Sequence, residues 1–337
     1  MLKFVEALSR LSGPSGWEDA VRAFLRAQAE PYADELYTDK LGNVHVLKKG
    51  RVSTRRPVIL AAYMDEPGFM VKDITCEGMV KFGLMTDTDV RTILGKCVWL
   101  GEKKLRGVVG RKPIHLTTAE ERKTVPEAGE LYIDFGATDH AMAIIRVSKG
   151  DCGCFDGPFR SLGENKILSK AMGRSLTCGA LLELMKKELP VDTWFVFTTG
   201  GLVGSRGAYA AAEGHKNAQV VTLDICPGED SGETQPLLGK GLVIPAMDRG
   251  TIYEENLRNR LRKAAETENI PVQPWAEIPV TGQAGVFREK GATVAALDCP
   301  VKFYAAPCQM ADRRDAAGIV PLLMGYLKEL EGSGDGN

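Results

Sequence analysis

The chain contains segments with two different secondary-structure patterns, and this division limits the folds that it can adopt. Between residues 69 and 162, short β-rich runs such as Gly68–Asp73 and Leu131–Phe135 follow one another, with frequent Gly and Pro between them. From residue 163 onward, longer helical patterns alternate with strand-like runs, as in Leu176–Leu189 followed by Thr193–Thr198. The alternation predicts an α/β fold with a mixed sheet sandwiched by helices, and the β-rich stretch predicts a small β-barrel.

The first 68 residues return to the α/β pattern. They contain the helical spacing of Trp17–Glu30 and the apolar run Pro57–Ala62, which is typical of a fully buried strand. We therefore expect a discontinuous α/β domain made of residues 1–68 and 163–331, with the β-barrel domain of residues 69–162 inserted into it. We predict that residues 332–337 form a disordered tail.

Composition excludes several classes of partner. Lys and Arg number 43 and Asp and Glu number 44, so the net charge of −1 provides no basic field for nucleic acid. No apolar run approaches the roughly 18–20 residues that a membrane span requires, and the N-terminus has no signal peptide pattern. Of the eight cysteines only Cys152 and Cys154 are close in sequence, so we expect free thiols and a cytoplasmic location.

Candidate site residues follow predicted strands. In an α/β sheet, ligands bind where the parallel strands end, which directs attention to Tyr63–Glu66, Thr199–Leu202 and Asp224–Pro227. Nine short motifs surround these positions. They are Leu11–Glu18, Asp39–Asn43, Asp65–Val71, Leu94–Lys96, Gly110–His115, Leu131–Ala137, Gly204–Ala208, Leu223–Asp224 and Met247–Arg249.

Together these motifs resemble the glutamyl aminopeptidase or tetrahedral aminopeptidase family (metallopeptidase family 42), which includes members named as cellulases. The resemblance covers nearly the whole chain. It implies a zinc-exopeptidase-like α/β domain with an inserted β-barrel that helps to build dimers and larger shells. It also implies two divalent ions, bridged by a carboxylate and a water, that hydrolyse the N-terminal peptide bond with a Glu as general base.

Most of the positions that carry this chemistry are altered. Where the family has its first ligand His, this chain has Tyr63, and where it has the bridging Asp, the chain has Gly173. The Glu pair of the family, base and then ligand, is replaced by Gly201 and Leu202, and the final ligand His is replaced by Ala305. Gly, Leu and Ala offer no donor atom, and a tyrosine binds metal only as a costly phenolate.

Two positions are retained. Asp224 stands at one ligand position, and Asp65 stands where the family has the Asp that orients the first ligand His. Arg174, next to the bridge position, would disfavour a dication if its side chain pointed inward.

No other residues replace the lost donors convincingly. None of the four histidines lies near Tyr63 or Ala305 in the sequence, and we interpret them as surface or structural residues. They are His45, His115, His140 and His215. A weak new metal site at Asp65, Asp224 and Cys226 remains an alternative. Cys226 flanks the cleft, but a nucleophilic cysteine needs a nearby base, so an inert thiol is favoured.

The sequence therefore predicts a homologue of two-metal aminopeptidases that lacks the parental catalysis and serves in binding or assembly. Its expected partners are copies of itself, as a dimer or larger shell, or an active paralogue. No tightly bound cofactor is expected. The alternative is an active hydrolase with a rearranged site, which would hold a zinc or cobalt pair.

The residue types around the cleft indicate which class of ligand it can bind. The resemblance places five residues as the lining of the vacated metal space, namely Tyr63, Met172, Leu202, Cys226 and Ala305. We expect this space to be apolar and roomier than in the family, and thus open to a peptide or a small apolar ligand.

Overall fold

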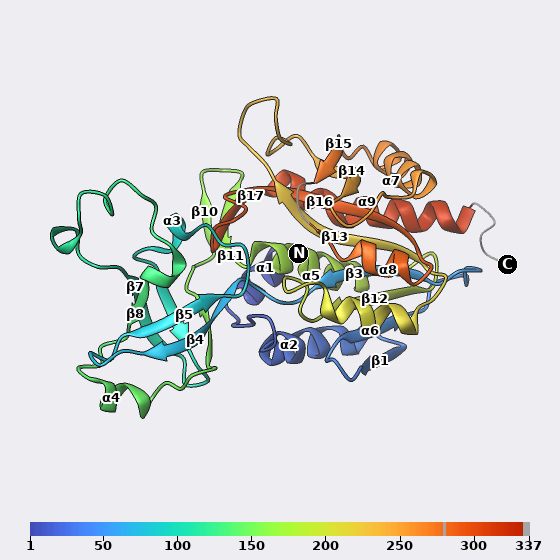
Figure 1. The fold of residues 1–337 in the computed structure, drawn as a ribbon. Coiled ribbons are helices and arrows are strands. Elements are labelled where there is room, and N and C mark those ends of the chain that lie inside the picture. The colour runs from blue at the N-terminus through green and yellow to red at the C-terminus, as the bar shows by residue number, and fades with distance from the viewer. Residues whose placement is uncertain (279–280, 333–337) are drawn as a thin grey trace.

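The computed structural model of the protein describes residues 1–278 and 281–332. A large α/β unit and a smaller β-barrel lie side by side, and the chain passes between them after residue 63 and again after residue 155 (Figure 1). The predicted fold class, a mixed sheet covered by helices together with a small β-barrel, is confirmed. The predicted tail falls almost entirely on residues 333–337, which lie outside the described residues.

One large mixed sheet forms the α/β unit. Its main path runs β1-β2-β12-β3-β13-β16-β17-β11-β10, with β14 pairing with both β15 and β16. The central strands β12, β3, β13 and β16 are parallel to one another. The strands are β1 (Glu35–Thr38), β2 (Val44–Lys48), β3 (Val58–Tyr63), β10 (Arg160–Leu162), β11 (Lys166–Lys170), β12 (Thr193–Thr198), β13 (Gln219–Pro227), β14 (Leu242–Asp248), β15 (Val272–Ile278), β16 (Thr293–Lys302) and β17 (Cys308–Asp312).

Helices cover both faces of this sheet, which explains why its central strands are apolar throughout. In β3, Leu60 and Ala62 pack into the core on one face, whereas Ile59 and Ala61 pack into the core on the other. The first face carries α1 (Leu2–Ser9), α2 (Asp19–Ala29), α5 (Met172–Met185), α7 (Glu255–Thr267) and α9 (Arg313–Gly332), and the second carries α6 (Arg206–Gly214) and α8 (Ala284–Glu289). A short 3-10 turn, Glu30–Tyr32, follows α2.

The barrel closes in the order β4-β5-β8-β7-β6-β9 around a core in which Phe69 packs edge-on against Phe82 and Phe155. Its elements are β4 (Gly68–Ile74), β5 (Val80–Leu84), α3 (Val90–Ile93), β6 (Cys97–Leu100), β7 (Leu105–Gly110), the 3-10 turns Ile114–Leu116 and Ala128–Glu130, β8 (Tyr132–Asp134), α4 (His140–Ile144) and β9 (Cys152–Phe155). The segment assigned to the barrel from sequence ends at residue 162, but β10 pairs with β11 in the large sheet. We therefore propose a boundary soon after β9.

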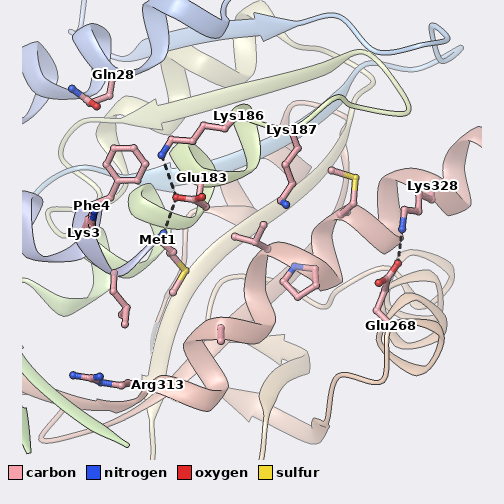
Figure 2. A pocket seen from close by; sticks show the side chains of 15 residues that line it. Met1, Lys3, Phe4, Gln28, Glu183, Lys186, Lys187, Glu268, Arg313 and Lys328 are labelled. Carbon is pink, nitrogen blue, oxygen red and sulfur yellow. Dashed lines mark hydrogen bonds and ion pairs between the residues drawn. The ribbon is translucent and has the colours of Figure 1, made fainter.

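A hollow of about 1040 Å³ opens between α1, the end of α5 and α9 (Figure 2). Its acidic side chains are paired, since Glu183 lies 3.4 Å from Lys186 and Glu268 lies 2.8 Å from Lys328. Within the described part of the chain, no helix is both long and apolar enough to cross a membrane.

Candidate functional site

Four polar side chains form a row across the carboxyl ends of the central strands. Thr198 of β12 is the register partner of Tyr63 of β3, and Asp224 of β13 is the partner of Asp298 of β16. The pairing of β13 with β3 continues up to Thr222 and Ala61, two residues before Asp224 and Tyr63. Because side chains at one level of a parallel sheet share a face, the row gathers these groups at the edge where ligands bind.

A cavity of about 330 Å³ lies at this edge, between the sheet and the first loops of the barrel. Most of its lining comes from the ends of β3, β12 and β13 and from the start of α5. The lining residues are Tyr63, Asp65, Pro67, Thr86, Asp87, Thr88, Ala171, Met172, Gly173, Arg174, Gly201, Leu202, Gly204, Ser205, Asp224, Ile225, Arg249, Thr281, Gly282, Gln283, Tyr304, Ala305, Ala306 and Gln309.

Tyr63 fills the centre of this region. Its side chain is 7% exposed, and its phenol lies close enough to the Asp224 carboxyl group for the two to interact electrostatically. A Cβ added to Gly173 would overlap the Tyr63 hydroxyl, and a Cβ added to Gly201 would overlap the Tyr63 Cβ. The tyrosine therefore occupies space that is free only because both neighbouring positions are glycine.

Part of the space that the sequence analysis expected to be open is filled. The phenol of Tyr63 lies beside Gly173, where the resemblance places the bridging Asp of the family. Met172, Leu202 and Ala305 line the cavity as expected. Cys226 is fully buried beside Val243, and burial raises the pKa of its thiol well above the usual value. Cys226 thus lies behind the cavity wall, with the character of an inert thiol.

Asp65 holds the loop that follows β12. Its carboxylate accepts hydrogen bonds from the backbone N–H groups of Gly201, at 2.9 Å, and Leu202, at 3.0 Å, and from the Ser15 hydroxyl, at 2.6 Å. Burial raises the pKa of Asp65 to about 6. The retained Asp65 is therefore a structural anchor of this loop.

Arg174 points away from the cavity centre. Its guanidinium donates to the Leu11 carbonyl, at 2.8 Å, and pairs with Glu66, at 3.0 Å. Glu66 also pairs with Lys170, at 3.0 Å, and all three side chains are buried. Arg174 and Lys170 thus share one carboxylate in a network that ties α5 to the N-terminal segment.

Two carboxyl groups in the row resist ionisation. Burial, with added repulsion from Asp248 and Asp65, raises the pKa of Asp224 to about 7. Burial and the nearby Asp224 raise the pKa of Asp298 well above its usual range, and Asp298 Oδ1 has no hydrogen-bond partner among the described residues. Burial also raises the pKa of Tyr63 well above 10, so this residue remains a phenol.

The histidines lie away from the cavity, although two of them are not surface residues. His45 Nδ1 lies 3.0 Å from His215 Nε2, and His45 Nε2 lies 3.2 Å from Asp39 Oδ2. Both rings are buried, and burial lowers the pKa of His215 to about 4. In the same hairpin, Asn43 accepts a hydrogen bond from the Thr199 N–H, at 2.9 Å, so this cluster supports the loop beside the cavity.

Comparison with known proteins assigns the family. A model of the M42 glutamyl aminopeptidase family matches residues 42–322. This chain belongs to the M42 family. It is 29% identical to a putative aminopeptidase of Acetivibrio thermocellus over 333 residues, which cover 96% of this chain and 97% of that protein.

Solved peptidase structures share the fold over nearly the whole chain. A TET aminopeptidase from the archaeon Thaumarchaeota archaeon SCGC AB-539-E09 superposes with a TM-score of 0.91 at 26% identity, covering 97% of this chain and 96% of that one. The TET1 peptidase of Pyrococcus horikoshii, which can assemble into a tetrahedron or a large octahedral shell, gives a TM-score of 0.86 at 26% identity, covering 97% and 98%. The resemblance inferred from the sequence motifs is confirmed.

The residues of this chain do not fit the metal pair that the M42 resemblance implies. At the bridge position Gly173 provides no oxygen, and the neutral phenol of Tyr63 takes the space. Leu202 and Ala305 provide no donor atom either. Within residues 1–278 and 281–332, no group of three or more His, Cys, Asp or Glu side chains is arranged to hold a metal ion.

Sequence reasoning missed several lining residues. Gln283 and Tyr304 reach the cavity from the start of α8 and from the β16–β17 connection, and Arg249 stands exposed at its rim. The Met247–Arg249 motif was the one available signal. Nothing in the local sequence around Gln283 and Tyr304 indicates which cavity they face.

Proposed function

We propose that this chain is an M42 family member that has lost two-metal peptide hydrolysis and acts through binding or assembly. The observation that carries the proposal is the packing of Tyr63 against Gly173 and Gly201. The three residues are complementary in shape, since the tyrosine fits only while both glycines lack a Cβ. A mutual fit of this kind is expected when the three positions change together and the site repacks. It is not expected when single residues are replaced independently of one another.

Loss of the general base supports the same proposal. Gly201 stands at the base position, and a positioned base contributes roughly 10²–10⁴-fold to rate. The nearest carboxylate to the Gly201 backbone is Asp65, whose two oxygens already accept three hydrogen bonds. Asp65 is therefore poorly placed to activate a water molecule.

We also propose that the chain forms a homo-oligomer, either a dimer or a larger shell. The alternative is that it assembles with an active paralogue. The connection between β7 and β8 projects from the barrel (Figure 1) and exposes apolar side chains at Ile114 (73%), Leu116 (58%) and Val125 (59%). Exposed apolar side chains grouped in one segment favour a protein interface. The TET1 peptidase of Pyrococcus horikoshii provides a related example of assembly. The eight free cysteines favour a cytoplasmic location.

The competing function is an active metal-dependent hydrolase with a rearranged site. Family membership and the opening of Asp224 into the cavity favour it. Such a site would draw ligands from Asp65, Asp224, Tyr63, Cys226 or a partner subunit. The burial of Cys226 and the hydrogen bonds of Asp65 count against this ligand set.

Metal analysis separates the two functions. Purified protein would be loaded with zinc or cobalt, dialysed and measured by inductively coupled plasma mass spectrometry, with an active M42 aminopeptidase as the positive control. Turnover would be measured on a panel of aminoacyl chromogenic substrates with added Co²⁺, Mn²⁺ or Zn²⁺. We expect no tightly held pair of ions and no metal-dependent turnover. Two ions per chain, or metal-dependent turnover, would overturn the proposal.

A further inference from the structure

The hollow of about 1040 Å³ forms a groove along α9. The helices α1 and α9 both pack against α5, and the hollow opens between them (Figure 2). Its lining extends along α9 from Arg313 to Lys328, a stretch of about 22 Å, since each helical residue adds roughly 1.5 Å. A further helix of about four turns could therefore lie beside α9 and complete a bundle with α1 and α5.

The volume of the groove agrees with a helix as its occupant. A helix with its side chains is roughly 10–12 Å across, so half of the volume of a length of about 22 Å is on the order of 900–1200 Å³. The groove measures about 1040 Å³ and is open to solvent. It therefore has room for one half of such a helix and leaves the other half in water. A small-molecule site, by contrast, typically encloses roughly 70–90% of the surface of its ligand.

The floor of the groove is apolar. Leu2 and Phe4 contribute to it from α1, and Val320, Pro321 and Met324 contribute from α9. Val320 and Met324 are four residues apart, so they share one face of the helix. The side chains of Leu2, Pro321 and Met324 are only half-buried, which leaves part of their apolar surface facing the open groove. A floor of this kind suits the apolar face of an amphipathic helix.

Cations surround this floor. The lining contains five cationic and two acidic side chains, an excess of three positive charges in a chain whose net charge is −1. Both acids form ion pairs within the lining. Lys3 and Lys187 are exposed and have no ion-pair partner among the described residues, and Arg313 donates to the neutral hydroxyl of Ser161. The unpaired positive charge favours an occupant that carries carboxylates.

The same lining disfavours a nucleic acid and a small anion. The carboxylates of Glu183 and Glu268 would face the phosphates of a nucleic acid. The aromatic ring in the lining, Phe4, is 9% exposed and has the Lys186 ammonium 4.2 Å from its centroid, so it offers no open face on which a base could stack. A small anion would leave the apolar floor uncovered.

We propose that this groove docks an acidic amphipathic helix of a partner protein. The apolar face of the helix packs on Leu2, Pro321 and Met324, and its Asp or Glu side chains pair with Lys3 and Lys187. The groove shares no lining residue with the cavity at Tyr63, so the proposal holds whether or not that cavity retains metal chemistry. It adds a second surface, and the chemistry of a partner, to the proposed binding role.

Fluorescence anisotropy with model peptides tests this docking site on the intact protein. The probe is a labelled peptide of 15 residues with Leu at positions i, i+3, i+4 and i+7 of each face repeat and Glu and Ala elsewhere. One control replaces every Glu with Lys, and the other replaces every Leu with Gln. We expect the acidic peptide to bind, more weakly at high salt, and each control to bind at least about tenfold more weakly. Absence of binding by the acidic peptide, or equal binding of the acidic and basic peptides, would overturn the proposal.

Charge reversal in the groove provides a second test. We expect Lys3→Glu combined with Lys187→Glu to weaken the acidic peptide at least about tenfold and to strengthen the basic peptide, a gain that misfolding cannot produce. Lys103→Glu combined with Lys104→Glu is the matched control, because both lysines are exposed in the turn between β6 and β7, outside the groove. Equal effects of the two double variants would contradict the proposal.

The apolar floor is tested by Met324→Gln, which keeps the length of the side chain. We expect it to weaken the acidic peptide at least about threefold, with an unchanged circular dichroism spectrum. Unchanged binding in this variant would show that the floor does not contact the peptide and would contradict the packing proposed for it.

Other occupants give different results. Dodecanoate that displaces the acidic peptide at a lower concentration than the unlabelled peptide does would indicate a small amphiphile and overturn the assignment of a helix. A smaller particle in light scattering of the groove variants without peptide would indicate that a second copy of the chain occupies the groove, with the same consequence.

Failure of this inference is distinguishable from failure of the proposed function, because metal content and turnover are measured on the same samples. Two bound ions with turnover would overturn the proposed function and leave the groove unaffected. Metal-free, inactive protein that does not bind the acidic peptide would overturn only this inference.

Discussion

The hydroxyl of Tyr63 occupies the space that any side chain at Gly173 would require. Gly173 is the second residue of α5, and Tyr63 is the last residue of β3, so the contact joins elements that are 110 residues apart in the chain. The phenol also interacts electrostatically with the Asp224 carboxyl group of β13. One aromatic side chain therefore links the start of α5 to the ends of two central strands.

Replacement of Gly173 by alanine is expected to destabilise the protein, because the new Cβ would overlap the Tyr63 hydroxyl. Overpacking of this kind costs about 1–3 kcal/mol of unfolding free energy. Gly179→Ala, on the same helix, is the matched control, because its Cβ would meet Phe4 and Val5 no closer than 3.4 Å. Urea unfolding should show a loss for Gly173→Ala and little change or a gain for Gly179→Ala. Equal effects would argue against the overlap.

Truncation of Tyr63 should rescue the Gly173 variant. In a double-mutant cycle with Tyr63→Phe, which removes the overlapping hydroxyl, we expect the Gly173→Ala penalty to shrink by about 1 kcal/mol. Additive effects of the two changes would show that the hydroxyl is not the clashing group.

Restoration of the family residues should restore metal binding only when Tyr63 is also changed. The full set comprises Tyr63→His, Gly173→Asp, Gly201→Glu, Leu202→Glu and Ala305→His. We expect this variant to hold zinc or cobalt after dialysis, whereas the same variant with Tyr63 retained should not, because the tyrosine blocks the bridge position. Equal metal content in the two variants, measured by mass spectrometry, would show that Tyr63 is no obstacle.

Asp224 should make the protein less stable as pH rises. Burial raises the pKa of Asp224 to about 7, so the folded state binds this proton more tightly than the unfolded chain does. Its contribution to the unfolding free energy is fully present below pH about 4 and is lost as pH rises through about 7, by on the order of 4 kcal/mol. Urea unfolding at pH 5 and pH 7.5 should show a smaller decline for Asp224→Asn than for the parent chain.

A carboxyl control separates this effect from general charge effects. Asp87→Asn removes an exposed carboxylate near the same cavity, and we expect its pH dependence to match that of the parent chain. If Asp224→Asn behaves in the same way as Asp87→Asn, then Asp224 does not hold a proton near neutral pH.

The β7–β8 connection should control assembly. Changing Ile114, Leu116 and Val125 together to serine removes the exposed apolar side chains, and we expect a smaller particle in light scattering after size-exclusion chromatography. Ile252→Ser, at an equally exposed apolar residue (65%) outside the barrel, is the control. An unchanged particle size in the triple variant would place the interface elsewhere.

Local patterns in the sequence were sufficient to predict the fold class and the family. The apolar run of β3 indicates a doubly covered strand, and the short β runs before β9 indicate a barrel, because side-chain periodicity reports which faces are buried. The β10 strand was misassigned to the barrel, since three exposed residues carry too little pattern to reveal their partner strand. The absence of side-chain donor atoms at Gly173, Leu202 and Ala305 was likewise visible from residue types alone.

What fills the resulting space was decided only by the tertiary structure. Sequence spacing cannot show that the side chain of Tyr63 reaches Gly173, that Gln283 faces the same cavity as Asp224, or that His215 is buried against His45. These contacts join residues from distant segments, and they depend on side-chain direction and packing volume. The sequence by itself therefore determined the fold class, the family and the residue types available at the site. The three-dimensional packing determined that the Tyr63 side chain fills the space beside Gly173 and that Asp224 lines the cavity.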